Sequence, residues 1–141
     1  MQLLAYILIY PILWMVSMLP FRILYFVSDL LYILMYYVIG YRKKVVKENL
    51  NLVFPNKSKA ELRIVLKRFY HHLCDMIVES VKSMNISIDS MKSRYKFNNL
   101  DIITDYEKQN KSIILMCAHY GSWEWIFILQ TYTTHRSYAI Y

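Results

Sequence analysis

The pattern of hydrophobic and polar positions divides the chain into a long apolar start and a mixed remainder. Residues 1–21 contain no charged side chain, and this length is enough to cross the hydrocarbon core of a bilayer. A second apolar stretch, residues 22–41, is interrupted by Arg22 and Asp29 and is rich in tyrosine, as interfacial helices are. We therefore predict a membrane-anchoring helical segment over residues 1–41, in which a spanning or deeply inserted helix precedes an interfacial one. A buried helical hairpin in a soluble protein is the alternative.

A long amphipathic helix is predicted in the middle of the chain. Residues 54–56, Phe-Pro-Asn, break the preceding pattern, and Ser58 with Glu61 forms the capping-box signature that starts a helix. The apolar residues that follow recur at the spacing of one helix face: Leu62, Val65, Leu66, Phe69, Leu73, Met76, Ile77 and Met84. Such a stripe predicts that this helix packs against another element.

The last third of the sequence alternates between strand and helix patterns. The predicted order is a strand at 94–97, a helix at 100–109, a strand at 112–118, a helix at about 123–132 and a strand beginning at 137–141. This order is typical of a parallel sheet with right-handed crossovers, so we predict an α/β domain that begins at residue 42 and continues to residue 141. Because a sheet of three strands leaves an open edge, we expect the domain to be truncated and the chain to be the N-terminal portion of a longer protein.

Composition and charge narrow the class of protein. The chain is 57% hydrophobic with only two glycines and three prolines, which excludes disorder and argues against a small turn-rich β protein. The net charge of +7 is concentrated after residue 40, beginning with Arg42, Lys43, Lys44 and Lys47. Cations beside an apolar segment are typical of the cytoplasmic side of a membrane, although an ordinary solvated face would look the same. An acidic partner also fits this charge, whereas no RNA-binding signature or basic recognition helix points to nucleic acid.

The cysteine and histidine positions predict neither a disulfide nor a metal site. Cys74 and Cys117 are far apart in sequence and form no CxxC pair, so we predict small buried hydrophobes in a reducing compartment. His71 and His72 lie beside Cys74 and Asp75, but a rotation of about 100° per residue keeps these helical side chains from converging. We therefore expect no metal and no cofactor.

A polar turn between two apolar runs is the strongest candidate for chemistry. It follows the predicted strand at 112–118, and open α/β sheets place their ligands at the carboxyl ends of strands. Gly121 can adopt a positive φ, and Ser122 can cap the next helix, which puts Glu124 in the first helical turn. If His119 lies outside that helix, its imidazole and the Glu124 carboxylate can approach each other.

A histidine and a carboxylate in this arrangement are suited to acid–base catalysis. The carboxylate accepts a hydrogen bond from one imidazole nitrogen, which fixes the tautomer and raises the basicity of the other nitrogen. That nitrogen of His119 can remove the proton from an acceptor hydroxyl as the oxygen attacks an acyl carbonyl. No serine or cysteine nucleophile with its own base is evident, so direct transfer fits better than a covalent acyl-enzyme. The alternative gives Glu124 only a helix-dipole role and His119 a turn role.

The stretch HYGSWEW, residues 119–125, resembles the catalytic motif H-x-x-x-x-(D/E) of the bacterial lysophospholipid acyltransferase superfamily. Within it, HYGSWE is closer to the late acyltransferases of lipid A biosynthesis, the lauroyl and myristoyl transferases, which usually read HYGNWE. Residues 47–62, KENLNLVFPNKSKAEL, resemble the same enzymes' segment of an Asn-Leu pair, a Phe-Pro and a capped helix. Two departures stand near the motif: Ser122 replaces the usual asparagine, and Ala118 stands where the family often has Gly or Asn. The resemblance runs over most of the chain, and its specific part is HYGSWE.

The resemblance implies an α/β acyltransferase in the bacterial inner membrane, with its active site facing the cytoplasm. It would transfer a fatty acyl chain from acyl-acyl carrier protein to a hydroxyl of a lipid A precursor, the glycolipid of lipopolysaccharide. In that reaction His119 would be the general base and Glu124 its orienter. The resemblance also assigns substrate contacts to Tyr120, Gly121, Ser122 and Trp123. The acidic carrier protein would suit the basic surface electrostatically.

Two points remain open in the sequence. The family's later arginine-containing and glycine-containing blocks have no counterpart before Tyr141, so we expect the 141-residue chain alone to be inactive. An acyltransferase acting on a lysophospholipid or an amino-acid lipid is one alternative function. A non-catalytic membrane-associated interaction protein is the other.

Overall fold

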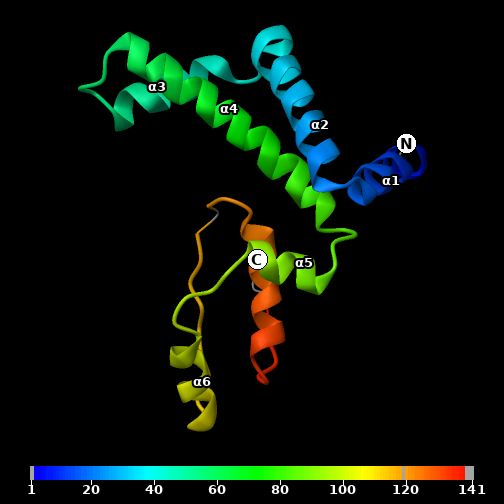
Figure 1. The fold of residues 1–141 in the computed structure, drawn as a ribbon. Coiled ribbons are helices and arrows are strands. Elements are labelled where there is room, and N and C mark those ends of the chain that lie inside the picture. Colours follow the sequence, from blue (N-terminus) through cyan, green and yellow to red (C-terminus); the bar gives the residue numbers. More distant parts are fainter. Residues whose placement is uncertain (1, 119, 139–141) are drawn as a thin grey trace. The chain divides into compact units, whose positions relative to one another are not determined.

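The structure is helical and falls into two compact units, Met1–Met84 and Asn85–Tyr141 (Figure 1). It is a computed structural model, which describes residues 2–118 and 120–138. The helices of the first unit are α1 (Gln2–Met18), α2 (Phe21–Ile33), the π-helix η1 (Leu34–Ile39), α3 (Lys43–Val53) and α4 (Lys59–Lys82). Those of the second unit are α5 (Ile88–Arg94), α6 (Leu100–Lys108) and the 3-10 helix η2 (Trp123–Tyr132).

The predicted parallel-sheet α/β fold is wrong, because residues 2–118 and 120–138 contain no β-strand. Where the first strand was predicted, α5 continues through Arg94 and an aromatic cluster follows. The ring of Phe97 lies 5.1 Å from that of Tyr95 and 5.9 Å from that of Tyr132 in η2. Contacts between these rings, and not pairing with a strand, therefore organise this part of the chain.

The second predicted strand, residues 112–118, has no strand partner in the part of the chain that the structure describes. Its apolar side chains are exposed on both sides, and Ile114 and Met116 are 90% and 92% exposed. A strand is stabilised by the ladder of hydrogen bonds to its neighbour, so an apolar run alone does not produce one. Of the third predicted strand, Ser137 and Tyr138 belong to no strand, and residues 139–141 lie outside the described residues.

The long helix predicted after Ser58 is confirmed as α4. Its N-terminus carries the expected capping box: the Ser58 hydroxyl accepts from the Glu61 N–H, and the Glu61 carboxylate accepts from the Ser58 N–H at 2.8 Å. The buried face repeats every four residues and consists of Leu66, Tyr70, Cys74, Val78 and Lys82. Of the predicted apolar stripe only Leu66 belongs to this buried face, which also includes Tyr70 and the aliphatic stem of Lys82, two residues that the predicted stripe did not contain.

An aromatic cluster joins α2 and η1 to α4. The rings of Tyr32 and Tyr36 stack with centroids 5.5 Å apart, and Tyr36 meets Tyr70 edge to face at 5.4 Å. Tyr70 is completely buried, and its hydroxyl donates a hydrogen bond to the carbonyl of Tyr41. That bond satisfies the polar end of a ring that otherwise contributes apolar surface to the core.

Polar contacts continue this interface along α2. The hydroxyl of Tyr25 donates to the Glu79 carboxylate at 2.7 Å, and that of Ser28 donates to Asp75 at 2.6 Å. The residue farther along α2 contacts the residue that comes earlier in α4, so the two helices run antiparallel. Each contact pairs a polar group of the apolar helix α2 with an acidic group of α4, which avoids leaving either unsatisfied.

Lys82 fastens the end of α1 to α4. Its side chain is buried, and its Nζ donates to the carbonyls of Ser17 at 2.7 Å and Leu19 at 2.9 Å. Ser17 belongs to the last turn of α1 and Leu19 follows its end, where backbone acceptors lack helical partners and a cation is favourable. Pro20 follows directly, so the helix ends here and α2 begins at Phe21.

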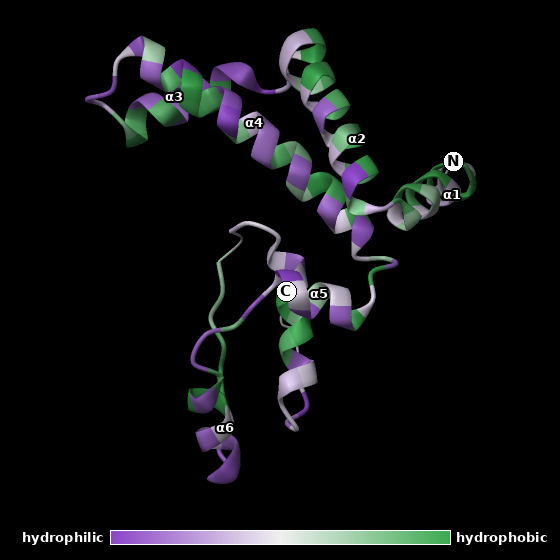
Figure 2. Ribbon diagram, viewed as in Figure 1, coloured by the Kyte–Doolittle hydropathy of each residue, from purple (hydrophilic) through white to green (hydrophobic). Residues whose placement is uncertain are grey.

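Both α1 and α2 expose many large apolar side chains, and Figure 2 shows hydrophobic positions along both helices, with hydrophilic ones among them on α2. Residues 6–12 of α1 are all exposed, and seven consecutive residues cover every side of a helix. The continuous helical stretch Phe21–Ile39 is long and apolar enough to cross a membrane by length and composition, and Tyr6–Met18 is a shorter apolar helix. A span-length helix thus lies where the sequence predicted an interfacial one.

Candidate active site

The predicted active-site turn connects the irregular segment 112–118 to the helix η2. Gly121 has a φ of +62°, the left-handed conformation for which we expected a glycine here. Ser122 occupies the N-cap position of η2, although its side chain makes no capping hydrogen bond. The helix starts instead with backbone bonds, in which Trp123 donates to Gly121 at 2.8 Å and Trp125 donates to Ser122 at 3.0 Å.

Glu124 lies in the first turn of η2, as predicted, and is half-buried. Tyr120 is 89% exposed, while Gly121, Ser122 and Trp123 are half-buried. His119 lies outside the described residues, so its pairing with Glu124 stays a prediction. The structure therefore brings together one carboxylate, one left-handed glycine and two tryptophans in a single turn.

Two buried side chains and an aromatic contact hold η2 in place. Trp125 and Ile128 are each only 4% exposed, and their spacing of three residues puts them on one face of a 3-10 helix. At the C-terminal end Tyr132 receives the ammonium of Lys92 from α5, 4.5 Å from the ring centre. These contacts anchor both ends of η2, the helix whose first turn contains Glu124.

Glu107 binds the turn that follows η2, a role that the sequence did not predict. Its carboxylate accepts hydrogen bonds from the Thr133 hydroxyl, from the Thr134 N–H at 2.8 Å and from the His135 N–H at 3.0 Å. The bond from Thr133 contributes most to lowering the pKa of Glu107 from 4.5 to about 2, followed by that from the His135 N–H. The carboxylate thus binds a three-residue turn 26 to 28 positions away, a separation that no local pattern reports.

The cysteines and the paired histidines have separate environments. Cys74 is buried as predicted, but Cys117 is exposed because the segment around it has no partner strand. His71 stacks on Tyr32 with ring centroids 3.6 Å apart, and its Nδ1 lies 3.6 Å from a carboxylate oxygen of Asp29. Within the described residues no three side chains of His, Cys, Asp or Glu are grouped to hold a metal ion.

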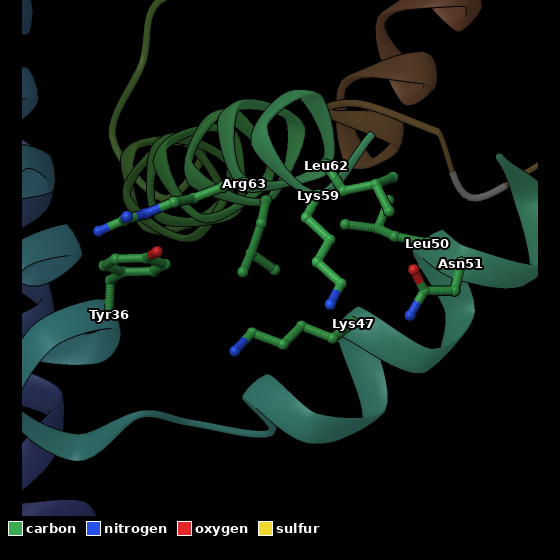
Figure 3. Close-up of a pocket in the computed structure, with 8 residues that line it drawn as sticks. Tyr36, Lys47, Leu50, Asn51, Lys59, Leu62 and Arg63 are labelled. Carbon is green, nitrogen blue, oxygen red and sulfur yellow. The ribbon is translucent and has the colours of Figure 1, made fainter. Parts of the chain in front are cut away.

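A cavity in the first unit is a second concentration of functional groups. It has a volume of about 480 Å³ and lies among η1, α3 and α4 (Figure 3). Its lining combines cations with apolar groups: Tyr36, Lys47, Leu50, Asn51, Lys59, Leu62, Arg63 and Leu66. In the sequence, the basic residues of the segment 47–62 were the one hint of this cavity. They converge only because α3 folds back against α4.

Comparison with known families gives one match. The family model described as bacterial lipid A biosynthesis acyltransferase matches residues 2–139, which is nearly the whole chain and includes the HYGSWE motif. No curated protein and no solved structure matches the chain. The coverage confirms the resemblance, and the protein belongs to the bacterial lipid A biosynthesis acyltransferase family.

Proposed function

We propose that this protein transfers a fatty acyl chain from acyl-acyl carrier protein to a hydroxyl of a lipid A precursor. The observation that carries the proposal is the family match over residues 2–139, within which HYGSWE stands at residues 119–124. The proposed site is on the cytoplasmic face of the bacterial inner membrane. Tyr120, Gly121, Ser122 and Trp123 are the proposed substrate contacts around the acid–base pair.

In the proposed reaction His119 is the general base and Glu124 orients it. The imidazole takes the proton of the acceptor hydroxyl, whose oxygen forms the new ester bond to the acyl carbon. The carbon–sulfur bond of the thioester breaks, and the departing thiolate receives the proton back from the imidazolium. Glu124 lies in the first turn of η2, and His119 precedes that helix in sequence. This order supports the proposed role, because a histidine outside the helix can approach the Glu124 carboxylate.

Membrane association is supported by the distribution of exposed apolar side chains in the first unit. On α2 and η1 they form one stripe, at Ile23, Phe26, Leu30, Ile33, Leu34 and Tyr37. The opposite side of the same helix contacts α4 through Ser28 and other polar groups. Burying α2 across the bilayer centre would carry the charges of α4 with it, at a large cost. We therefore propose that α1 inserts deeply while α2 and η1 lie in the interface with this stripe toward lipid.

The distribution of charge supports the proposed orientation and the proposed acyl donor. Arg42, Lys43, Lys44 and Lys47 come directly after the apolar segment, and positive charge at that position is retained on the cytoplasmic side. A net charge of +7 also favours an acidic protein as the donor's carrier, because complementary charge accelerates encounter.

The test is transfer of a labelled acyl chain from its carrier protein to lipid A precursor by membranes containing the full-length protein. We predict that His119→Ala lowers the rate by about 10²-fold or more, because the acceptor hydroxyl loses its base. Glu124→Gln keeps the size of the side chain but removes its charge, and it is expected to lower the rate as well. Exposed residues of the same types provide controls: His72→Ala and Glu48→Gln are expected to retain the rate.

Two measurements test the proposal: the melting of the variants and the identity of the lipid that is acylated. If His119→Ala and Glu124→Gln proteins melt normally in detergent yet transfer acyl chains at the normal rate, the catalytic roles are refuted. If the intact protein acylates a lysophospholipid or an amino-acid lipid and leaves the lipid A precursor unmodified, the proposed acceptor is refuted while the acid–base roles stand.

A further inference from the structure

The cavity among η1, α3 and α4 gathers positive charge from two helices. Lys47 comes from α3, while Lys59 and Arg63 come from the first turn and a half of α4. Figure 3 shows the side chain of Lys59 extending toward the stem of Lys47 and that of Arg63 reaching toward the ring of Tyr36. Like charges brought together from separate elements repel each other, and an anion between them removes that cost.

No carboxylate of the chain supplies that anion within the described residues. None lines the cavity, and Lys47, Lys59 and Arg63 form no ion pair in the part of the chain that the structure describes. Glu61 lies between the two cations of α4 in sequence, but both its carboxylate bonds go to Ser58 in the capping box. The local acidic group is thus committed to starting α4, and the cations remain available to a ligand.

The other wall of the cavity is apolar. Leu50 from α3 and Leu62 and Leu66 from α4 line it, and the ring of Tyr36 closes one side. A fourth cation, Lys43, lies over that ring 3.7 Å from its centre, which adds positive potential at the same place. A free inorganic anion would gain nothing from the leucines, whereas an amphiphile would use both kinds of wall.

The cavity lies at the end of the apolar helical stretch. Tyr36 belongs to its last turns, the stretch ends at Ile39, and the basic helix α3 begins four residues later. The boundary between an apolar helix and a basic segment is where the headgroups of anionic lipids concentrate. Exposed apolar side chains adjoin the cavity in sequence on both sides, with Val38 72% and Leu52 78% exposed.

We propose that this cavity binds the phosphate-bearing headgroup of one anionic phospholipid. The phosphate lies among Lys47, Lys59 and Arg63, and the adjoining apolar part of the lipid lies against Leu50 and Leu62. The volume of about 480 Å³ suits a headgroup and the first part of its chains. The site is in the first unit and does not depend on the acyl transfer proposed for residues 119–124.

The test is native mass spectrometry of the full chain in a neutral detergent, titrated with phosphatidylglycerol or with zwitterionic phosphatidylcholine. We expect one phosphatidylglycerol to bind preferentially. Replacing Lys47, Lys59 and Arg63 together by Gln is expected to weaken that first binding step by about tenfold or more, since each cation near an anionic headgroup contributes. The matched control replaces Lys44, Lys57 and Arg68 by Gln, which removes the same charge from exposed positions outside the cavity.

Each outcome decides the proposal. Equal weakening by the two triple variants would mean general attraction to a basic surface and would overturn a specific site. Displacement of phosphatidylglycerol by millimolar glycerol 3-phosphate would show that the cavity takes a soluble phosphate, and would also overturn it. Far-ultraviolet circular dichroism and melting temperature establish that both variants fold. If the cavity variant fails to fold, the single substitution Arg63→Gln against Arg68→Gln gives the same comparison, with about threefold as the expected difference.

Discussion

The two units differ in what holds them together. In Met1–Met84 the helices are joined by side-chain contacts between residues 47 to 65 positions apart, such as Ser28 with Asp75 and Lys82 with Ser17, around a buried aromatic cluster. In Asn85–Tyr141 fewer side chains are buried, and one carboxylate, Glu107, makes most of the described long-range hydrogen bonds.

This difference matters because the candidate catalytic turn belongs to the second unit. Binding and catalytic residues commonly lie on segments of low local stability, whereas packed elements provide support. The segment 112–118 before the turn has no regular secondary structure and is exposed, and η2 after it is anchored by Trp125 and Ile128. We therefore expect core substitutions in the first unit to destabilise the protein strongly, and substitutions at the Glu107 turn to act locally.

The largest effect is expected from Tyr70→Ala in the core of the first unit. Removing a completely buried ring leaves a cavity among Tyr36, Leu66 and Cys74, and such changes cost about 3–5 kcal/mol. Tyr70→Phe is the matched control, because it keeps the ring and removes only the hydrogen bond to Tyr41, at about 1 kcal/mol. Urea unfolding in mild detergent, followed by helicity, measures both. A loss below about 1 kcal/mol for Tyr70→Ala would contradict the central position given to this cluster.

Lys82→Met comes next. Methionine keeps the apolar stem but leaves the carbonyls of Ser17 and Leu19 without their charged donor, which we expect to cost about 2 kcal/mol. Hydrogen exchange should rise in the last turn of α1 and not in α6. The control is Lys108→Met, since Lys108 is exposed and, among the described residues, forms its ion pair with Asp105 three residues away. If the two variants are equally stable, the buried lysine does not fasten α1.

Local chemistry made the helix boundaries predictable. The capping box at Ser58 predicted the start of α4, and the apolar pattern predicted α6 and η2 to within one residue of their ends. The left-handed conformation of the glycine before η2 was also predictable from the sequence, because few other residues take that conformation. These features depend on neighbours within one or two turns, which a single sequence contains.

Features that depend on distant partners were not predictable. The apolar run at 112–118 has a strand-like composition, but pairing requires a second strand, and the composition of one segment does not report it. The buried face of α4 includes Tyr70 and Lys82 because Tyr41 and the end of α1 accept their hydrogen bonds. The charged and the apolar side chains that line the α3–α4 cavity likewise come together only after α3 folds back on α4.

The smallest and most local effect concerns the pH response of Glu107. Its folded pKa of about 2 lies below the usual 4.5, so the carboxylate stabilises the turn at 133–135 above pH 4.5, and that contribution is lost as the pH falls through 2. Carbon NMR of the labelled carboxyl group should give a midpoint near 2. Thr133→Val removes the hydroxyl that lowers the pKa most, so the midpoint should rise toward 4.5. Glu61, which bonds to Ser58 in the other unit, provides the control, and its titration should not change. A Glu107 midpoint near 4.5 in the unaltered protein would mean that the carboxylate does not accept the hydrogen bonds of the turn. It would then not hold the second unit together, and the contrast with the first unit would be lost.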